Sequence, residues 1–155
     1  MRKWIEPVTD RSLLDIKVRA PKAFLHADDL NRIESNIAYL SERINRLGYN
    51  IEAVLPTDWR KCAVPRVADV ERICDNILKI INAYRKPDGY TDLSDIPQKA
   101  LHITDVNDLE RNLLLLLELL ESGLSHGFLT RFTHGELKQY THAQIRTGGV
   151  TSPAS

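Results

Sequence analysis

The sequence predicts an all-α protein with three amphipathic helices, built on a degenerate repeat of about 40 residues and joined by long irregular connections. Two observations support this fold class. Three segments share an Asp-x-x-Arg pattern whose aspartates stand at positions 29, 69 and 108. Isoleucines and leucines then recur at steps of three and four, the spacing that places them on one face of a helix. The expected helices cover residues 26–46, 66–85 and 104–122.

An extended N-terminal arm is expected before the first helix, over residues 1–24. Its apolar residues are interrupted by Pro7 and Pro21, and no helical periodicity runs through it. A weak apolar alternation allows a short strand around residues 15–19. Residues 25–122 then form the helical core.

The third expected helix differs from the other two in its apolar residues. Leucine fills every position from 113 to 117, so apolar side chains surround most of the helix. A helix that is apolar on most sides is usually buried on most sides. We therefore expect this helix either to be central in the core or to meet another subunit.

Each repeat places an aspartate three residues before an arginine, which is close enough for an ion pair on a helix surface. These pairs are Asp29–Arg32, Asp69–Arg72 and Asp108–Arg111. The simpler interpretation is a solvated pair at the start of each helix. The alternative is that each arginine reaches a neighbouring subunit or loop.

Two connections, roughly residues 48–65 and 86–103, are much longer than compact helical bundles require. Both contain prolines, so we do not expect further long helices within them. They either run extended across the helices or contact something outside the chain.

A C-terminal extension with short repeats is expected over residues 123–155. Histidines at positions 126, 134 and 142 recur every eight residues. His126, His134 and His142 raise the hypothesis of a metal site, but no Cys, Asp or Glu recurs beside them to complete a ligand shell. We expect no bound metal, although convergence of these histidines in an assembly stays open.

Charge and motifs exclude most functional classes. The chain has 155 residues, with 21 Lys+Arg and 21 Asp+Glu, and a net charge of zero argues against nucleic acid as the main partner. No apolar run is long enough for a membrane span, and the N-terminus does not resemble a secretory signal. Two cysteines cannot build a disulfide framework. We found no catalytic motif, so we expect no enzyme, no cofactor and no small-molecule substrate.

Several segments together resemble small structural proteins encoded among the tail and baseplate genes of tailed bacteriophages and prophages of Gram-positive bacteria. They are Trp4-Ile5-Glu6-Pro7-Val8-Thr9-Asp10-Arg11, Ala27-Asp28-Asp29-Leu30-Asn31-Arg32-Ile33-Glu34-Ser35-Asn36, Thr57-Asp58-Trp59, Asn107-Asp108-Leu109-Glu110 and Tyr140-Thr141-His142-Ala143-Gln144-Ile145. The similarity runs loosely over residues 4–145. His26 departs from it, because such proteins commonly place a capping Asn there.

The resemblance implies a virion structural role without catalytic residues, in a tail made in the host cytoplasm. The surplus apolar surface of the expected helices favours symmetric assembly, so we expect a homo-oligomer that also contacts other tail or baseplate proteins. The predicted function is therefore a non-enzymatic adaptor subunit of a tail, baseplate or fibre-attachment assembly. Alternatives are a small helical regulator or inhibitor of one protein partner, a nucleic-acid binder and a metalloprotein. The nucleic-acid binder would use Arg32, Arg72 and Arg111.

Overall fold

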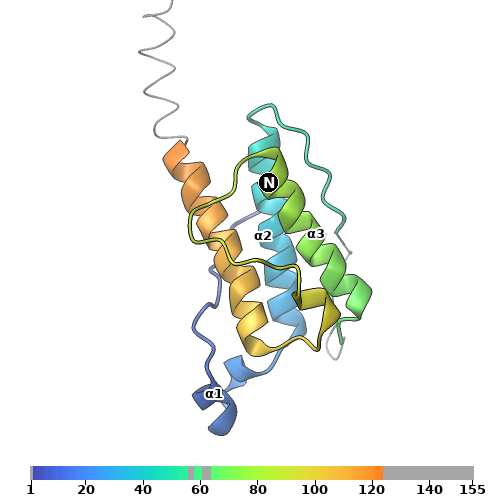
Figure 1. The fold of residues 1–155 in the computed structure, drawn as a ribbon, viewed down its shortest axis with the longest axis vertical. Coiled ribbons are helices and arrows are strands. Elements are labelled where there is room, and N and C mark those ends of the chain that lie inside the picture. Colours follow the sequence, from blue (N-terminus) through green and yellow to red (C-terminus); the bar gives the residue numbers. More distant parts are fainter. Residues whose placement is uncertain (1, 56–57, 61–63, 124–155) are drawn as a thin grey trace, which may run out of the picture. The chain divides into compact units, whose positions relative to one another are not determined.

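The computed structural model describes residues 2–55, 58–60 and 64–123, and within these ranges the chain forms helices and no strands (Figure 1). The elements are α1 (Leu13–Lys17), the 3-10 turn η1 (Pro21–Ala23), α2 (Ala27–Asn45), α3 (Val67–Ala83), the 3-10 turn η2 (Ile96–Gln98) and a helix over residues 103–123, here called the C-terminal helix. The predicted all-α class is confirmed, and the three long helices lie within a few residues of their expected bounds. The C-terminal histidines 126, 134 and 142 lie outside the described residues.

The chain divides into two compact units, Met1–Glu118 and Leu119–Ser155. The first unit contains α1, α2, α3 and residues 103–118 of the C-terminal helix. All packing described below belongs to this first unit.

The three long helices of the first unit run in the same direction (Figure 1). The 19 residues of α2 span about 28 Å at 1.5 Å per residue. After each helix the chain must therefore return over that length before the next parallel helix begins. Extended backbone covers the distance in about nine residues, and both long connections exceed that number. They run back along the helices, which is the first of the two alternatives that their length left open.

The long helices begin in the same way. In each, an aspartate three residues after the N-cap accepts the backbone N–H of the N-cap residue, as in half of a capping box. These bonds join His26 to Asp29 (2.8 Å), Arg66 to Asp69 (2.9 Å) and His102 to Asp105 (2.7 Å). The third helix start is thus marked by Asp105, and the sequence alignment of this copy on Asp108 was wrong by three residues.

The core is built from apolar residues at matching distances from these three N-caps. They are Leu30, Val70 and Val106; Ile33, Ile73 and Leu109; Ile37, Ile77 and Leu113; Leu40, Ile80 and Leu116, none more than 6% exposed. The predicted apolar faces are confirmed at these positions, where burial of each side chain contributes about 1.5–3 kcal/mol. Leu47 and Leu78, which the same spacing predicts on the faces of the first two helices, are 44% and 36% exposed.

The leucine-rich helix is covered largely by its own chain. Leu114 and Leu115 are half-buried, and no residue of the C-terminal helix belongs to the exposed large apolar side chains of the described residues. A Cβ atom at Gly89 would lie 3.9 Å from Leu115, so the second long connection passes over this leucine. Surplus apolar surface therefore lies elsewhere in the described chain.

The N-terminal segment is partly helical, and the strand expected around residues 15–19 was wrong. Ser12 caps α1, accepting from the Asp15 N–H at 3.3 Å, while Asp15 accepts the Ser12 N–H at 2.7 Å. This reciprocal pair stabilises a helical turn where hydrophobic alternation alone suggested extended chain. α1 ends at Lys17, and two residues later Arg19 adopts a left-handed conformation with φ of 53°.

Candidate functional site

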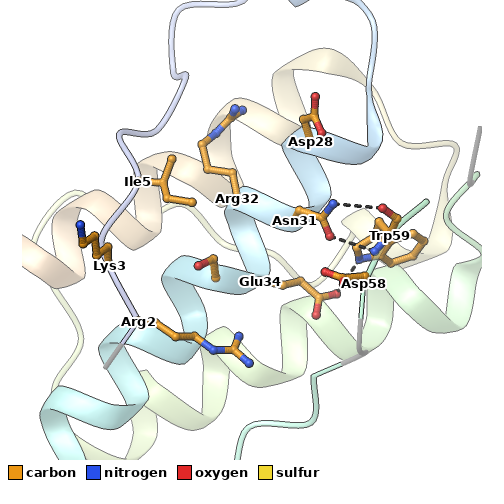
Figure 2. Close-up of a pocket in the computed structure, with 10 residues that line it drawn as sticks. Arg2, Lys3, Ile5, Asp28, Asn31, Arg32, Glu34, Asp58 and Trp59 are labelled. Atoms are coloured by element: carbon orange, nitrogen blue, oxygen red, sulfur yellow. Dashed lines mark hydrogen bonds between the residues drawn. The ribbon is translucent and has the colours of Figure 1, made fainter. Parts of the chain in front are cut away.

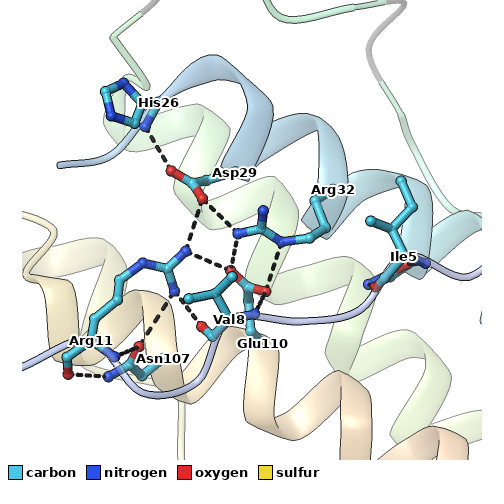
Figure 3. A network of polar contacts seen from close by, with 9 residues as sticks. Ile5, Val8, Arg11, His26, Asp29, Arg32, Asn107 and Glu110 are labelled. Atoms are coloured by element: carbon cyan, nitrogen blue, oxygen red, sulfur yellow. Dashed lines mark hydrogen bonds and ion pairs between the residues drawn. The ribbon is translucent and has the colours of Figure 1, made fainter. Parts of the chain in front are cut away.

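A buried ion cluster attaches the N-terminal arm to two helices (Figure 3). Nη2 of Arg11 lies 2.9 Å from Asp29 on α2 and 2.9 Å from Glu110 on the C-terminal helix. Nη1 of the same guanidinium donates to the Val8 carbonyl oxygen. Arg11 is only 5% exposed, so its charge is balanced by carboxylates rather than by water.

Arg32 completes this cluster from α2. Its Nε and Nη2 donate to the two oxygens of Glu110 at 3.0 and 2.7 Å, the bidentate geometry that guanidinium and carboxylate groups favour. Nη2 also lies 2.5 Å from Asp29. Burial alone would raise the pKa of Asp29, but the bonds from the His26 N–H and from Arg32, together with the charge of Arg11, outweigh it and lower that pKa. The solvated-pair interpretation was therefore wrong for Asp29 and Arg32, because both side chains are largely buried. Asp29 also pairs with Arg11 of the arm, and Arg32 with Glu110 of the C-terminal helix.

A second arginine–glutamate pair joins α3 to α2. Nη2 of Arg72 lies 2.8 Å from Oε1 of Glu34, and the indole N–H of Trp59 donates to the same oxygen at 3.2 Å. Arg72 stands six residues after its N-cap and Glu34 eight residues after its own, the same offsets as Arg32 and Glu110. The bundle thus repeats one polar contact, from α3 to α2 and from α2 to the C-terminal helix. Arg111, the third predicted arginine, is exposed on the C-terminal helix.

Asparagine side chains hold the extended segments onto the helices. In each case Oδ1 accepts the N–H, and Nδ2 donates to the C=O, of one residue of the arm or a connection, at 2.7–3.2 Å. These asparagine clamps pair Asn31 with Trp59, Asn36 with Ile5, Asn45 with Ile51, Asn76 with Val54, Asn107 with Arg11 and Asn112 with Thr91. Each clamp satisfies both backbone groups of a residue that has no strand partner within the described chain.

The clamping asparagines and the glutamates Glu34 and Glu110 were not identified from the sequence, although the spacing of the asparagines could have indicated them. Asn36, Asn76 and Asn112 all stand ten residues after an N-cap. A periodic asparagine within a helix is unusual, because its short amide favours caps and turns. Counting from the capping aspartates rather than from the Asp-Leu-Glu-Arg match would have aligned all three.

The candidate docking surface lies on α1, where no residue is buried. We define the α1 surface as Leu13, Leu14 and Val18, which are 61%, 66% and 64% exposed. Leu14 and Val18 are four residues apart and share one side of the helical turn. The ion cluster at Arg11 holds the chain immediately before this turn against the bundle.

Neighbouring charges define the surroundings of the α1 surface. Lys17 and Arg19 are exposed beside it. On the following turn, Lys22 forms ion pairs with Asp10 at 2.8 Å and with Asp15 at 3.5 Å. The α1 surface thus consists of exposed apolar side chains bordered by the cations of Lys17 and Arg19. The nearby carboxylates of Asp10 and Asp15 are paired with Lys22.

A separate cavity of about 650 Å³ lies where the N-terminal arm, α2 and the Trp59 segment meet (Figure 2). The exposed carboxylates of Asp28 and Asp58 line this cavity. Trp59, a residue of the first long connection, lines it as well. Arg2 and Lys3 line it from the arm. The cavity thus offers charged groups of both signs beside an aromatic ring.

The described residues offer little for catalysis or for metal binding. They contain no group of three His, Cys, Asp or Glu side chains that could hold a metal ion. Burial raises the pKa of the Cys74 thiol to about 12, which keeps it protonated and unreactive near neutral pH. Cys62 lies outside the described residues. None of the described helices combines the length and apolarity needed to cross a membrane.

No protein-family model matches the chain, and neither the curated proteins nor the solved structures contain a significant match.

Proposed function

We propose that the protein is a non-enzymatic adaptor subunit that acts through protein–protein contacts. The observation that carries the proposal is the α1 surface, where Leu13, Leu14 and Val18 expose more than 60% of their area while the C-terminal helix leaves no leucine exposed. Clustered exposed apolar side chains of this kind are typical of interaction sites. The ion cluster at Arg11 supports the proposal, because it gives the turn a fixed place on a rigid bundle.

The assembly we propose is a phage tail, baseplate or fibre attachment, with second copies of this chain and other tail proteins as partners. The resemblance of residues 4–145 to tail-associated structural proteins supports this setting. A basic border from Lys17 and Arg19 favours a partner surface that is apolar with acidic residues at its rim.

Substitutions on the α1 surface test the proposal. Leu14→Glu with Val18→Glu should abolish oligomerisation, measured by light scattering, and incorporation into particles, measured by cofractionation. A matched control is Val64→Glu with Val67→Glu, which adds the same charges at residues 81% and 61% exposed outside α1. The proposal fails if the unmodified protein stays monomeric over a wide concentration range and cofractionates with no particle.

A regulator that binds a single protein partner is the second candidate, and it would use the same α1 surface. The two functions differ in where the protein is found. A regulator would bind one partner with defined stoichiometry and would be absent from purified particles, whereas an adaptor would be a component of them.

A further inference from the structure

Two glutamates occupy the same position in the bundle but differ in their hydrogen bonds. Glu34 and Glu110 each stand eight residues after the N-cap of their helix. Both oxygens of Glu110 are satisfied, by two guanidinium groups and by the Val8 N–H at 2.6 Å. Glu110 therefore shows which donors a glutamate at this position takes when both of its oxygens are hydrogen-bonded.

Only one of the two carboxylate oxygens of Glu34 is hydrogen-bonded. Its Oε1 accepts from Arg72 and from the Trp59 indole, whereas its Oε2 has no hydrogen-bond partner among the described residues. The residue is nevertheless only 4% exposed. An unpaired carboxylate oxygen at this depth costs more than a paired one, since it has lost water without gaining a donor.

The missing donors can be traced to particular residues. Asn31 holds the backbone of Trp59 in the same way that Asn107 holds the backbone of Arg11. Glu34 therefore meets an indole with a single N–H, where Glu110 meets the guanidinium of Arg11. Arg72 directs its Nη1 to the Val54 carbonyl.

Glu34 lines the 650 Å³ cavity together with two further carboxylates (Figure 2). Asp28 and Asp58 are exposed, and no hydrogen bond or ion pair involves their side chains within the described part of the chain. Three cations also line the cavity. Arg32 on α2 is paired with Asp29 and Glu110, and in Figure 2 the backbone that carries Arg2 and Lys3 lies on the opposite side from Asp58 and Trp59. Asp28, Asp58 and Glu34 thus form an acidic side of the cavity, and the unpaired Oε2 of Glu34 is covered in this structure.

We propose that this acidic side binds an arginine side chain of a partner protein. Its guanidinium would donate to Asp28 or Asp58 beside the Trp59 ring and, once the Glu34 carboxylate turns toward the cavity, to Oε2 of Glu34. Arginine is preferred over lysine because its planar fork serves several carboxylate oxygens and stacks on aromatic rings. The chain already pairs the equivalent Glu110 with two arginines. This site is distinct from the α1 surface and does not rest on the proposed adaptor function.

N-acetyl-arginine amide serves as the probe, titrated into ¹⁵N-labelled full-length protein. The readout is the Trp59 indole N–H resonance, identified in a Trp4→Phe background. We expect a saturable shift with the arginine amide and none with N-acetyl-citrulline amide, which has nearly the same shape without the charge. Asp28→Asn with Asp58→Asn should weaken binding about fivefold, as expected for two partly exposed ion pairs.

The control variant carries Asp75→Asn and Asp88→Asn, which remove the same charge from exposed positions outside the cavity. It should bind the probe as the unmodified protein does. The proposal is overturned if the Trp59 resonance does not respond, or if citrulline or lysine amides bind equally well. It is also overturned if the double substitution at Asp28 and Asp58 leaves the affinity unchanged.

Discussion

Arg11 and Glu110 form an ion pair across 99 residues of sequence, with Nη2 and Oε1 2.9 Å apart and side chains only 2% and 1% exposed. The pair connects the N-terminal arm to the C-terminal helix, while Asp29 connects the same guanidinium to α2. Because the charges are almost fully desolvated, neither can be removed alone without leaving the other unpaired. The cluster therefore determines where the arm lies, and with it α1.

Replacing Arg11 should destabilise the protein strongly. Arg11→Ala leaves Asp29 and Glu110 short of a buried donor, and we expect a loss of about 3–5 kcal/mol in the free energy of unfolding. Urea unfolding followed by circular dichroism measures it. Arg111→Ala is the control, an exposed arginine on the C-terminal helix whose loss should change stability by less than about 0.5 kcal/mol. Equal losses of stability in the two variants would show that the ion cluster does not hold the N-terminal arm against the helices.

An asparagine clamp can be tested on a single helix. Asn76 is 1% exposed and binds the N–H and C=O of Val54, whereas Asn82 is exposed on the same helix. Asn76→Ala should cost about 1–3 kcal/mol, because two backbone groups lose their partner. Hydrogen exchange at the Val54 amide should accelerate, while Asn82→Ala should leave that rate unchanged. Unchanged protection of Val54 in the Asn76 variant would contradict the clamp.

The helices could be predicted because their apolar spacing and capping aspartates are local signals. Leu30, Ile33 and Ile37 indicate the buried face of α2 without knowledge of any other segment. The register of the third copy was wrong because Asp108 begins an Asp-Leu-Glu-Arg match, while the helix start depends on Asp105. Capping geometry, not letter similarity, determines where a helix begins.

The polar contacts between segments could not be predicted. Glu110 meets Arg11 only because the long connections return the chain to the same end of a parallel bundle, a property of the whole topology. The same applies to Glu34 and Trp59. α1 was predictable in principle, since Ser12-x-x-Asp15 is a capping signal, but its exposed leucines are known only from the packing of everything around them.

Cys74 should resist thiol reagents in the folded protein. It is 3% exposed, and burial raises its pKa to about 12, so thiolate is scarce near neutral pH. In a Cys62→Ser background, we expect Ellman's reagent to react slowly in native buffer and rapidly in concentrated urea. Stopped-flow absorbance gives both rates. Rapid reaction in native buffer would mean that α3 opens locally far more often than a buried core position allows.

The pH dependence of stability should reveal Asp29. Its pKa in the folded protein lies below the ordinary value of 3.8, because the His26 N–H, Arg32 and Arg11 outweigh the effect of burial. A lowered pKa stabilises the fold above pH 3.8, and this contribution is lost as the pH falls through the folded value. Asp29→Asn lacks the contribution at every pH. The difference in unfolding free energy between the unmodified protein and this variant should therefore be constant near neutral pH and shrink below about pH 4. Urea titrations across this range measure the difference, in which the titration of most other groups cancels. A difference that grew as the pH fell would mean that Asp29 is destabilised as a carboxylate, and the charge assignment of the cluster would have to be reversed.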